Sequence, residues 1–320
     1  MAQGELDLST PPKTLSRAQA EAQIRTLRRI LQRHNHLYYV EARPEISDGE
    51  YDDLYRRLSA LEEAFPDLIA ADSPTQRVGA EPREGLPTIR HTAPMLSLDS
   101  TKDEGDLLRF DERIRKAAGD RVRYLVEPKL DGVSVELVYE DGLLVRGVTR
   151  GNGRQGEGVT ENVRTIPSVP LRIRDEVRPA PSMLAVRGEV LMYLSEFRKL
   201  NRKLMEEGAD PFANPRNAAA GALRQLDSRI TAQRPLGLLA FDVLAVAGAE
   251  FQEDREVMEA LGDWGFKVPE RVEFMEDVEG ILDYHQRYFR DRDDLDYEID
   301  GIVIKLNDLK ARAEMGSTSR

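Results

Sequence analysis

A lysine with a carboxylate two positions away on either side lies in the segment 127–132, which reads Glu-Pro-Lys-Leu-Asp-Gly. Apolar and β-branched residues precede and follow this segment, so we expect a strand on each side of it. Because strand side chains alternate, Glu127, Lys129 and Asp131 should lie on one face. Two interpretations are open: a solvated edge strand with a salt-bridged lysine, or a lysine that acts as a nucleophile.

The nucleophile interpretation sets a condition on the surroundings of Lys129. A lysine amine attacks only after it has lost its proton, which a desolvated site or a neighbouring cation favours. The flanking carboxylates of Glu127 and Asp131 act in the opposite direction. Positive charge must therefore come from elsewhere, either from a metal ion held by the acids or from basic residues that the fold brings close.

Candidate partners for this site lie on strands further along the chain. Arg150 ends one predicted strand and enters the turn Gly151-Asn152-Gly153, where its fork of donors could bind ribose or phosphate. Arg187 and Glu189 share one face of a strand predicted over 184–191. For that pair, a simple surface salt bridge is the alternative.

The last predicted strand covers 298–306 and contains the sequence Asp-Gly-Ile-Val-Ile-Lys at 300–305. Strict alternation would place Asp300 and Lys305 on opposite faces. Either Gly301 carries a bulge, therefore, or Asp300 precedes the regular strand. Near Lys129, Lys305 would supply the cation that a nucleophilic lysine requires, and it would also neutralise phosphate.

A second group of polar and aromatic residues lies near the N-terminus. Asp48 and Asp52 are one helical turn apart beside Tyr51, and Tyr38 and Tyr39 are close in sequence. Acids in a first turn and half-buried tyrosines are common for structural reasons alone. The functional alternative is a cup for a small planar cation, because aromatic faces and carboxylates both attract one.

The predicted elements indicate an α+β protein of two domains. Apolar residues recur at helical spacing after Ser16, and a capping box at 47–50 opens a second helix that Pro66 ends. We expect disorder over the first 15 residues or so, and a turn-rich connector at 72–79. The predicted domains are 1–75, a helical domain, and 76–320, a domain of antiparallel or mixed sheets packed together with helices outside.

Composition excludes several classes of protein. The chain has 320 residues, 40% of them hydrophobic and 32% charged, with no run apolar enough to cross a membrane, so a cytoplasmic location is expected. It has no cysteine, which excludes disulfides and thiolate zinc sites within it. The net charge of −12 argues against a surface that binds nucleic acid by charge alone.

Four motifs appear in a fixed order: Lys-Leu-Asp-Gly at 129–132, Thr-Arg-Gly-Asn-Gly at 149–153, Arg-Gly-Glu-Val at 187–190 and the segment 300–305. Together they resemble the covalent nucleotidyltransferases, which comprise DNA ligases, RNA ligases and mRNA-capping enzymes. The N-terminal segment 34–52 and the sequences at 72–79 and 94–99 are similar to bacterial NAD-dependent DNA ligases in particular.

The resemblance implies that Lys129 is the nucleophile and that further residues bind the two halves of NAD. The nicotinamide mononucleotide (NMN) half is implied to be held by Tyr38, Tyr39, Asp48, Tyr51 and Asp52, with Tyr39 standing where many members have histidine. The adenylate half is implied to be held by Ser97, Leu98, Glu127, Asp131, Gly132, Arg150, Glu189, Phe241, Asp300 and Lys305. Glu127 is expected to recognise the adenine amino group, and Phe241 stands where some members have tyrosine.

The reaction that the resemblance implies is self-adenylation, in which Lys129 attacks the α-phosphorus of NAD and releases NMN. Magnesium is implied as well, although no dedicated metal site is readable in the sequence. Nicked double-stranded DNA is the implied partner of a complete enzyme acting in DNA replication and repair, and we expect a monomeric adenylation fragment. The alternatives are an ATP- or GTP-using relative and a non-catalytic nucleic-acid-binding module.

Overall fold

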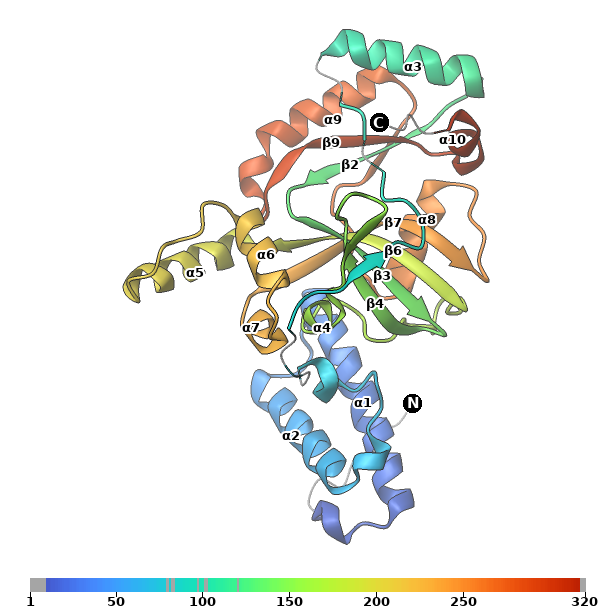
Figure 1. The fold of residues 1–320 in the computed structure, drawn as a ribbon. Helices are drawn as coiled ribbons and strands as arrows, with labels where there is room; N and C mark the ends of the chain where they lie inside the picture. The colour runs from blue at the N-terminus through green and yellow to red at the C-terminus, as the bar shows by residue number, and fades with distance from the viewer. Residues whose placement is uncertain are drawn as a thin grey trace.

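The computed structural model describes residues 10–78, 81, 84–96, 98–100, 103–119 and 121–316. An N-terminal helical hairpin lies beside a larger part built from sheets with helices around them (Figure 1). Within these ranges no helix combines the length and the apolar character that crossing a membrane requires.

The hairpin consists of α1 (Arg17–Tyr39) and α2 (Asp48–Ala64). Ser16 and Ser47 begin the two helices, each in a capping box with the residue at the third helical position, as predicted for the second. The helices pack through buried alanine, isoleucine and leucine side chains, and α2 ends before Pro66 as predicted. Pro12–Thr14 form a 3₁₀ turn, so the disorder expected for the first 15 residues does not extend over this turn.

The connector after α2 contains two 3₁₀ turns, Pro66–Leu68 and Pro74–Arg77. Arg77 is partly buried and donates to three carbonyl oxygens of the larger part, those of Arg164 at 3.0 Å, Ile166 at 3.0 Å and Val169 at 3.1 Å. Three directed hydrogen bonds from one rigid guanidinium fix the connector on the larger part.

Asp72 forms a second link between the two parts. Its buried carboxylate accepts hydrogen bonds from Arg28 of α1 and from Arg172 of the larger part, the latter at 2.6 Å. Burial raises the pKa of Asp72, but the hydrogen bond from Arg172 and the charges of both arginines outweigh it, so the pKa is lowered. This aspartate therefore stays ionised and holds the helical hairpin against the larger part.

Replacing Asp72 should destabilise the protein much more than replacing an exposed partner of the same kind. We expect Asp72→Ala to lower the free energy of unfolding by about 3 kcal/mol, because it leaves the partly buried Arg28 and the more exposed Arg172 without their buried carboxylate. The control is Asp67→Ala, which breaks an exposed pair with Arg17 and should cost under about 1 kcal/mol. Urea denaturation of both variants measures the difference, and equal losses would contradict the structural role of Asp72.

The larger part is built around a four-stranded sheet with the order β4-β3-β6-β7. Its strands are β3 (Val133–Glu140), β4 (Leu143–Thr149), β6 (Met183–Met192) and β7 (Leu236–Ala247). The predicted hairpin at Asp141-Gly142 joins β3 to β4, with both residues at positive φ.

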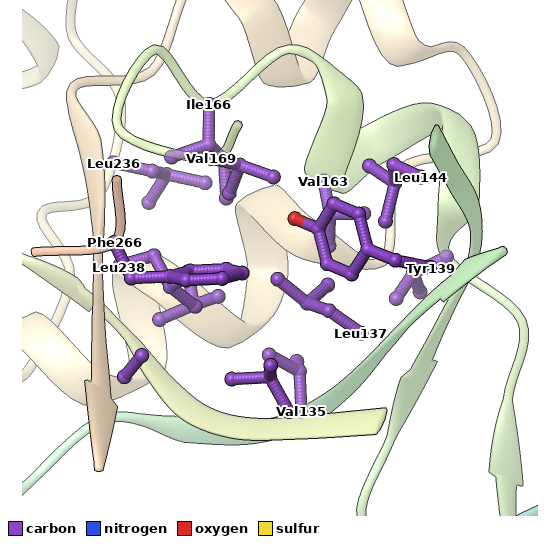
Figure 2. Packing of buried hydrophobic residues seen from close by; sticks show 14 of the residues in the cluster. Val135, Leu137, Tyr139, Leu144, Val163, Ile166, Val169, Leu236, Leu238 and Phe266 are labelled. Carbon is purple, nitrogen blue, oxygen red and sulfur yellow. The ribbon is translucent and has the colours of Figure 1, made fainter. Parts of the chain in front are cut away.

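Valine, leucine and aromatic side chains on one face of this four-stranded sheet form the main core (Figure 2). Helices α4 (Thr160–Arg164), α6 (Pro215–Leu223) and α8 (Asp254–Asp263) cover this face.

A three-stranded sheet with the order β8-β2-β9 packs on the other side. Its strands are β2 (Tyr124–Leu130), β8 (Glu273–Met275) and β9 (Ile299–Leu306). Helices α3 (Glu104–Ala118) and α9 (Val278–Arg290) cover its outer face and share a core that also includes Leu191 and Leu239 of the larger sheet. The two sheets therefore face each other (Figure 1).

The remaining described elements lie around these sheets. Strands β1 (Thr88–Arg90) and β5 (Gln155–Glu157) pair with each other, and every strand pairing in the described ranges is antiparallel. The other elements are α5 (Leu194–Glu206), α7 (Ser228–Ala232), α10 (Leu309–Met315) and a 3₁₀ turn at Arg292–Asp294. The α+β class predicted from the sequence is confirmed.

Candidate active site

Lys129 lies near the end of β2, opposite an irregularity in β9. The pairing of the two strands shifts between Pro128 and Leu130, whose partners Ile302 and Ile299 are three residues apart instead of two. The extra residue makes a bulge in β9, where Gly301 has a φ of +119°, a value that favours glycine. The bulge that the sequence left as one of two alternatives is therefore present.

The bulge places Asp300 against the motif lysine. Lys129 Nζ donates to Asp300 Oδ2 at 2.5 Å, and the lysine side chain is 42% exposed. Taken alone, this pair fits the interpretation of a solvated, salt-bridged strand. The buried residues beside it distinguish the segment from an ordinary edge strand.

Glu127 and Lys305 form a buried ion pair on the inner face of the same sheet. Glu127 Oε1 lies 2.8 Å from Lys305 Nζ, which also donates to the carbonyl oxygen of Phe241 at 3.0 Å. Burial lowers the pKa of Lys305, but the negative charges of Glu127, Asp242 and Asp254 outweigh it, so the pKa is raised and the lysine stays protonated. The other oxygen, Glu127 Oε2, is buried and has no hydrogen-bond partner among the described residues.

The position of Lys305 changes one part of the sequence interpretation. We expected Lys305 to supply positive charge to Lys129, yet the two lysines lie in separate ion pairs, with Glu127 and Asp300 respectively. Pairing with Glu127 neutralises Lys305 locally because the two charges are buried together. Lys305 therefore gives no net positive charge to Lys129 in this structure.

The wall opposite is the inner face of the larger sheet. Ser134 pairs with Glu189 across β3 and β6, and Arg187 lies on the same face of β6. Arg187 donates to the carbonyl of Leu96 at 3.2 Å, and its guanidinium carbon lies 5.6 Å from the centroid of the Phe241 ring. Lys305 Nζ lies 5.5 Å from the same centroid, so two cations contact this ring.

Burial raises the pKa of Glu189 to about 7, against the opposing effects of Arg187, Ser134, Arg216 and the Gly132 backbone. A carboxyl group whose pKa is raised stabilises the folded state below the unfolded value of 4.5, and this contribution is lost as the pH rises toward 7.

The raised pKa of Glu189 predicts a pH-dependent stability. Relative to Glu189→Gln, the wild type should lose about 3 kcal/mol of unfolding free energy between pH 4.5 and pH 7, since one pKa unit corresponds to about 1.4 kcal/mol. Urea denaturation of both proteins across this range measures the loss. Parallel pH profiles for the two proteins would show that Glu189 does not titrate in this way.

Asp131 and Gly132 follow the motif lysine and contact other elements. Asp131 Oδ1 accepts a hydrogen bond from Arg216 of α6 at 2.7 Å, and its backbone N–H donates to Glu298. A Cβ atom on Gly132 would lie 2.4 Å from the carbonyl oxygen of Val190, so only glycine fits there. Arg216 lies in the sequence Asn-Pro-Arg-Asn at 214–217, which begins α6, so this ion pair links the start of α6 to the motif.

Arg150 follows β4, and its backbone N–H donates to the carbonyl of Ser134 at 2.9 Å. This contact fixes the backbone of Arg150 to the strand that carries the inner wall. Leu98 is 56% exposed. Ser97 lies outside the described residues.

The five N-terminal residues predicted to act together all line one cavity. The cavity has a volume of about 280 Å³, and its wall includes Tyr38, Tyr39, Asp48, Tyr51 and Asp52. Tyr51 donates to Asn35 at 2.9 Å, while Tyr38 and Tyr39 pack edge to face with ring centroids 4.8 Å apart and remain partly exposed. The cavity thus combines aromatic faces with two carboxylates, the surroundings that suit a planar cation.

Sequence reasoning missed two buried residues near the inner wall, His91 and Glu136. They form a hydrogen-bonded pair and lie far apart in the sequence. An ionisable residue in the middle of a buried strand was the one available signal for Glu136, and nothing local marked His91. In the described ranges, no group of three or more histidine, aspartate or glutamate side chains is arranged to hold a metal ion.

Comparison with known proteins gives two family matches. Residues 83–320 match the model described as NAD-dependent DNA ligase adenylation domain, and residues 17–79 match the DNA ligase-like, N-terminal NAD+-binding domain.

Curated relatives named DNA ligase match nearly the whole chain. The protein from Alkalilimnicola ehrlichii is 52% identical over 94% of this chain and 44% of its own length, and that from Haloferax volcanii is 50% identical over 97% and 44%. The chain therefore spans a little under half the length of these relatives. A solved structure of mycobacterial DNA ligase D complexed with ATP and MES aligns with 60% of this chain and 51% of its own chain, at 16% identity and a TM-score of 0.32. At this TM-score the match carries no argument about fold or function.

Proposed function

The chain belongs to the family of NAD-dependent DNA ligase adenylation domains, and from this premise we propose that it transfers AMP from NAD to its own Lys129. The observation that carries the proposal is the placement of Lys129 and Asp300 beside a buried, polar inner wall, with the bulge at Gly301 bringing the two side chains together. Lys129 is the nucleophile, and NMN is the leaving group.

The proposed step forms one bond and breaks another at the same phosphorus. The Lys129 ammonium gives one proton to the Asp300 carboxylate that accepts its hydrogen bond, and the freed lone pair forms the N–P bond. The bond from the α-phosphorus to the bridging oxygen breaks, NMN leaves with that electron pair, and the new N–P nitrogen loses its second proton to solvent. In-line displacement requires the attacking amine and the leaving NMN to lie on opposite sides of phosphorus. Correct positioning of these two groups therefore provides much of the rate acceleration. Asp300 holds Nζ in place, and the amine must leave this ion pair to attack.

The facing sides of the two sheets supply groups for the adenylate half. The unpartnered Glu127 Oε2 is suited to accept a hydrogen bond from the adenine amino group. Phe241 offers a ring for the base, and Arg150 lies at the strand end beside Ser134. Lys305 stays protonated in its pair with Glu127, and we assign it to the phosphate because its Nζ can still donate hydrogen bonds. We assign Asp131, Gly132, Glu189, Ser97 and Leu98 to the same half.

The cavity between α1 and α2 is proposed to hold the leaving half of NAD. Its two aspartates carry negative charge and its three tyrosines offer ring faces, both of which attract the cationic nicotinamide. Tyr39 belongs to this set because it lines the cavity with the others. An ATP- or GTP-using enzyme has no use for such a cavity, and this favours NAD over the alternative nucleotides.

The activity of a complete protein goes beyond this chain. We propose that such a protein passes AMP from Lys129 to a 5′-phosphate at a nick in double-stranded DNA and then joins that end to the 3′-hydroxyl. Magnesium would enter with the phosphates, because Asp131 and Asp300 are already paired with Arg216 and Lys129. A cytoplasmic location and a monomeric state belong to the same proposal.

Intact-mass measurement after incubation with magnesium and either NAD or ATP tests the nucleotide. We expect one adenylyl group on the protein with NAD and at least about tenfold less labelling with ATP. A preference for ATP would support the alternative nucleotidyltransferase. Salt-sensitive DNA binding with no adduct from either nucleotide would support a non-catalytic binding module.

A further inference from the structure

A buried histidine and a buried glutamate link three segments beside the proposed adenylate site. His91 Nδ1 lies 2.7 Å from Glu136 Oε2, and both side chains are almost completely buried, at 1% and 0% exposure. Glu136 Oε1 accepts a hydrogen bond from the backbone N–H of Thr92 at 2.9 Å. On its other side, His91 Nε2 lies 3.0 Å from the carbonyl oxygen of Arg150.

The partners determine where the protons lie. A carbonyl oxygen only accepts, so His91 Nε2 carries a hydrogen and donates it to Arg150. The contact between Nδ1 and Glu136 requires one more proton, shared between the imidazole and the carboxylate. With that proton, every hydrogen-bonding atom of this histidine–glutamate pair has a partner. An unsatisfied polar atom would be costly at this depth.

The contacts around the pair hold the segment 91–96 against the turn that follows Arg150. His91 N–H donates to the carbonyl of Arg154 at 3.0 Å, and Met95 N–H donates to that of Gly153 at 2.8 Å. Gly153 N–H in turn donates to the carbonyl of Arg150 at 2.9 Å, so this oxygen accepts from both the turn and the histidine. The backbone position of Arg150 is therefore fixed from two directions.

Glu136 also connects the pair to the inner wall. It lies directly opposite Arg187 in the pairing of β3 with β6, on the sheet face that carries Ser134 and Glu189. Arg187 donates to the carbonyl of Leu96, at the end of the segment that His91 begins. The buried pair therefore joins the backbone of Arg150 and of the segment 91–96 to the strand that faces Arg187.

We propose that His91 and Glu136 are positioning residues for the adenylate half of the site, acting through the backbone of Arg150 and the segment 91–96. The inference rests on the proposed function, in which Arg150 contacts the adenylate. The pair itself touches neither substrate nor the reacting atoms. Its loss should weaken binding of AMP and leave binding of NMN, which the helical cavity holds, unchanged.

Two substitutions separate positioning from general stability. In His91→Asn the amide nitrogen can take the place of Nδ1 and still donate to Glu136, while the donor to Arg150 is lost. In Glu136→Gln the amide oxygen can accept from Thr92 and the amide nitrogen can donate to Nδ1 of a neutral His91, so all the hydrogen bonds remain. We therefore expect His91→Asn to impair the site and Glu136→Gln to behave like the wild type.

Equilibrium titration with AMP and with NMN, separately, tests the inference without catalysis. We expect His91→Asn to weaken AMP binding about tenfold, a change of about 1.4 kcal/mol in binding free energy, because the backbone of Arg150 is no longer held in place. NMN binding should be unchanged, and Glu136→Gln should stay within twofold of wild type. In adenylation kinetics, KM for NAD should rise about tenfold while the rate at saturating NAD changes little.

Two results would overturn the inference. One is AMP binding by His91→Asn within twofold of wild type. The other is an equal loss of AMP and NMN binding, which would indicate a general structural role. These outcomes are distinct from failure of the proposed function, which would appear as a wild-type protein that acquires no adenylyl group from NAD.

Discussion

Lys129→Ala should acquire no adenylyl group from NAD under conditions that label the wild type completely. The substitution removes the only atom proposed to bond to phosphorus and leaves Glu127, Lys305 and the inner wall in place. Because Lys129 is half-exposed at a strand end, we expect the free energy of unfolding to change by under about 1 kcal/mol. Intact-mass measurement after incubation with NAD and magnesium provides the comparison.

Two further variants make this result specific. Lys129→Arg retains the positive charge beside Asp300, but a guanidinium does not lose its proton in proteins, so it should also remain unlabelled. Lys199→Ala removes another exposed, ion-paired lysine on α5 and should be labelled like the wild type. Substantial labelling of Lys129→Ala would show that another residue is the nucleophile.

Asp48→Asn should weaken NMN binding by about 10- to 100-fold. The substitution keeps the size of the side chain and removes one of the negative charges lining the cavity between α1 and α2. Interactions with a charged group contribute about 1.5–3 kcal/mol, which corresponds to this range of affinities. AMP binding should be unchanged, because the adenylate half is assigned to the sheets. Calorimetric titration with NMN and with AMP measures the two dissociation constants.

A matched control lies on the same helix. Asp53→Asn also removes an acid from α2, but Asp53 is exposed, pairs with Arg56 and is not among the residues lining the cavity. It should bind NMN like the wild type. Equal effects of the two substitutions would show that the overall charge of the helix matters and the cavity does not. Reduced AMP binding by Asp48→Asn would contradict the division of NAD between the two parts.

Much of the fold could be predicted because local signals agreed with tertiary structure. The capping box at Ser47, the stop at Pro66 and the turn at Asp141-Gly142 each depend on the conformational preferences of a few consecutive residues. The bulge in β9 was one of the two alternatives that strict alternation left for Asp300 and Lys305, and only the register of β9 on β2 decides between them.

The contacts within the site were harder to predict because they join residues far apart in the sequence. The pairing of Glu127 with Lys305, rather than of Lys305 with Lys129, depends on the register between β2 and β9, which no local pattern fixes. Arg216 reaches Asp131 only because α6 packs on the larger sheet. His91 and Glu136 likewise meet across 45 positions.

Locating the adenylyl group by tandem mass spectrometry, on wild-type protein incubated with NAD and magnesium, tests the central claim most directly. The account predicts a single modified peptide with AMP on the side-chain nitrogen of Lys129, and release of one NMN for each group attached. AMP on any other residue, or unmodified Lys129 in protein that has consumed NAD, would contradict it.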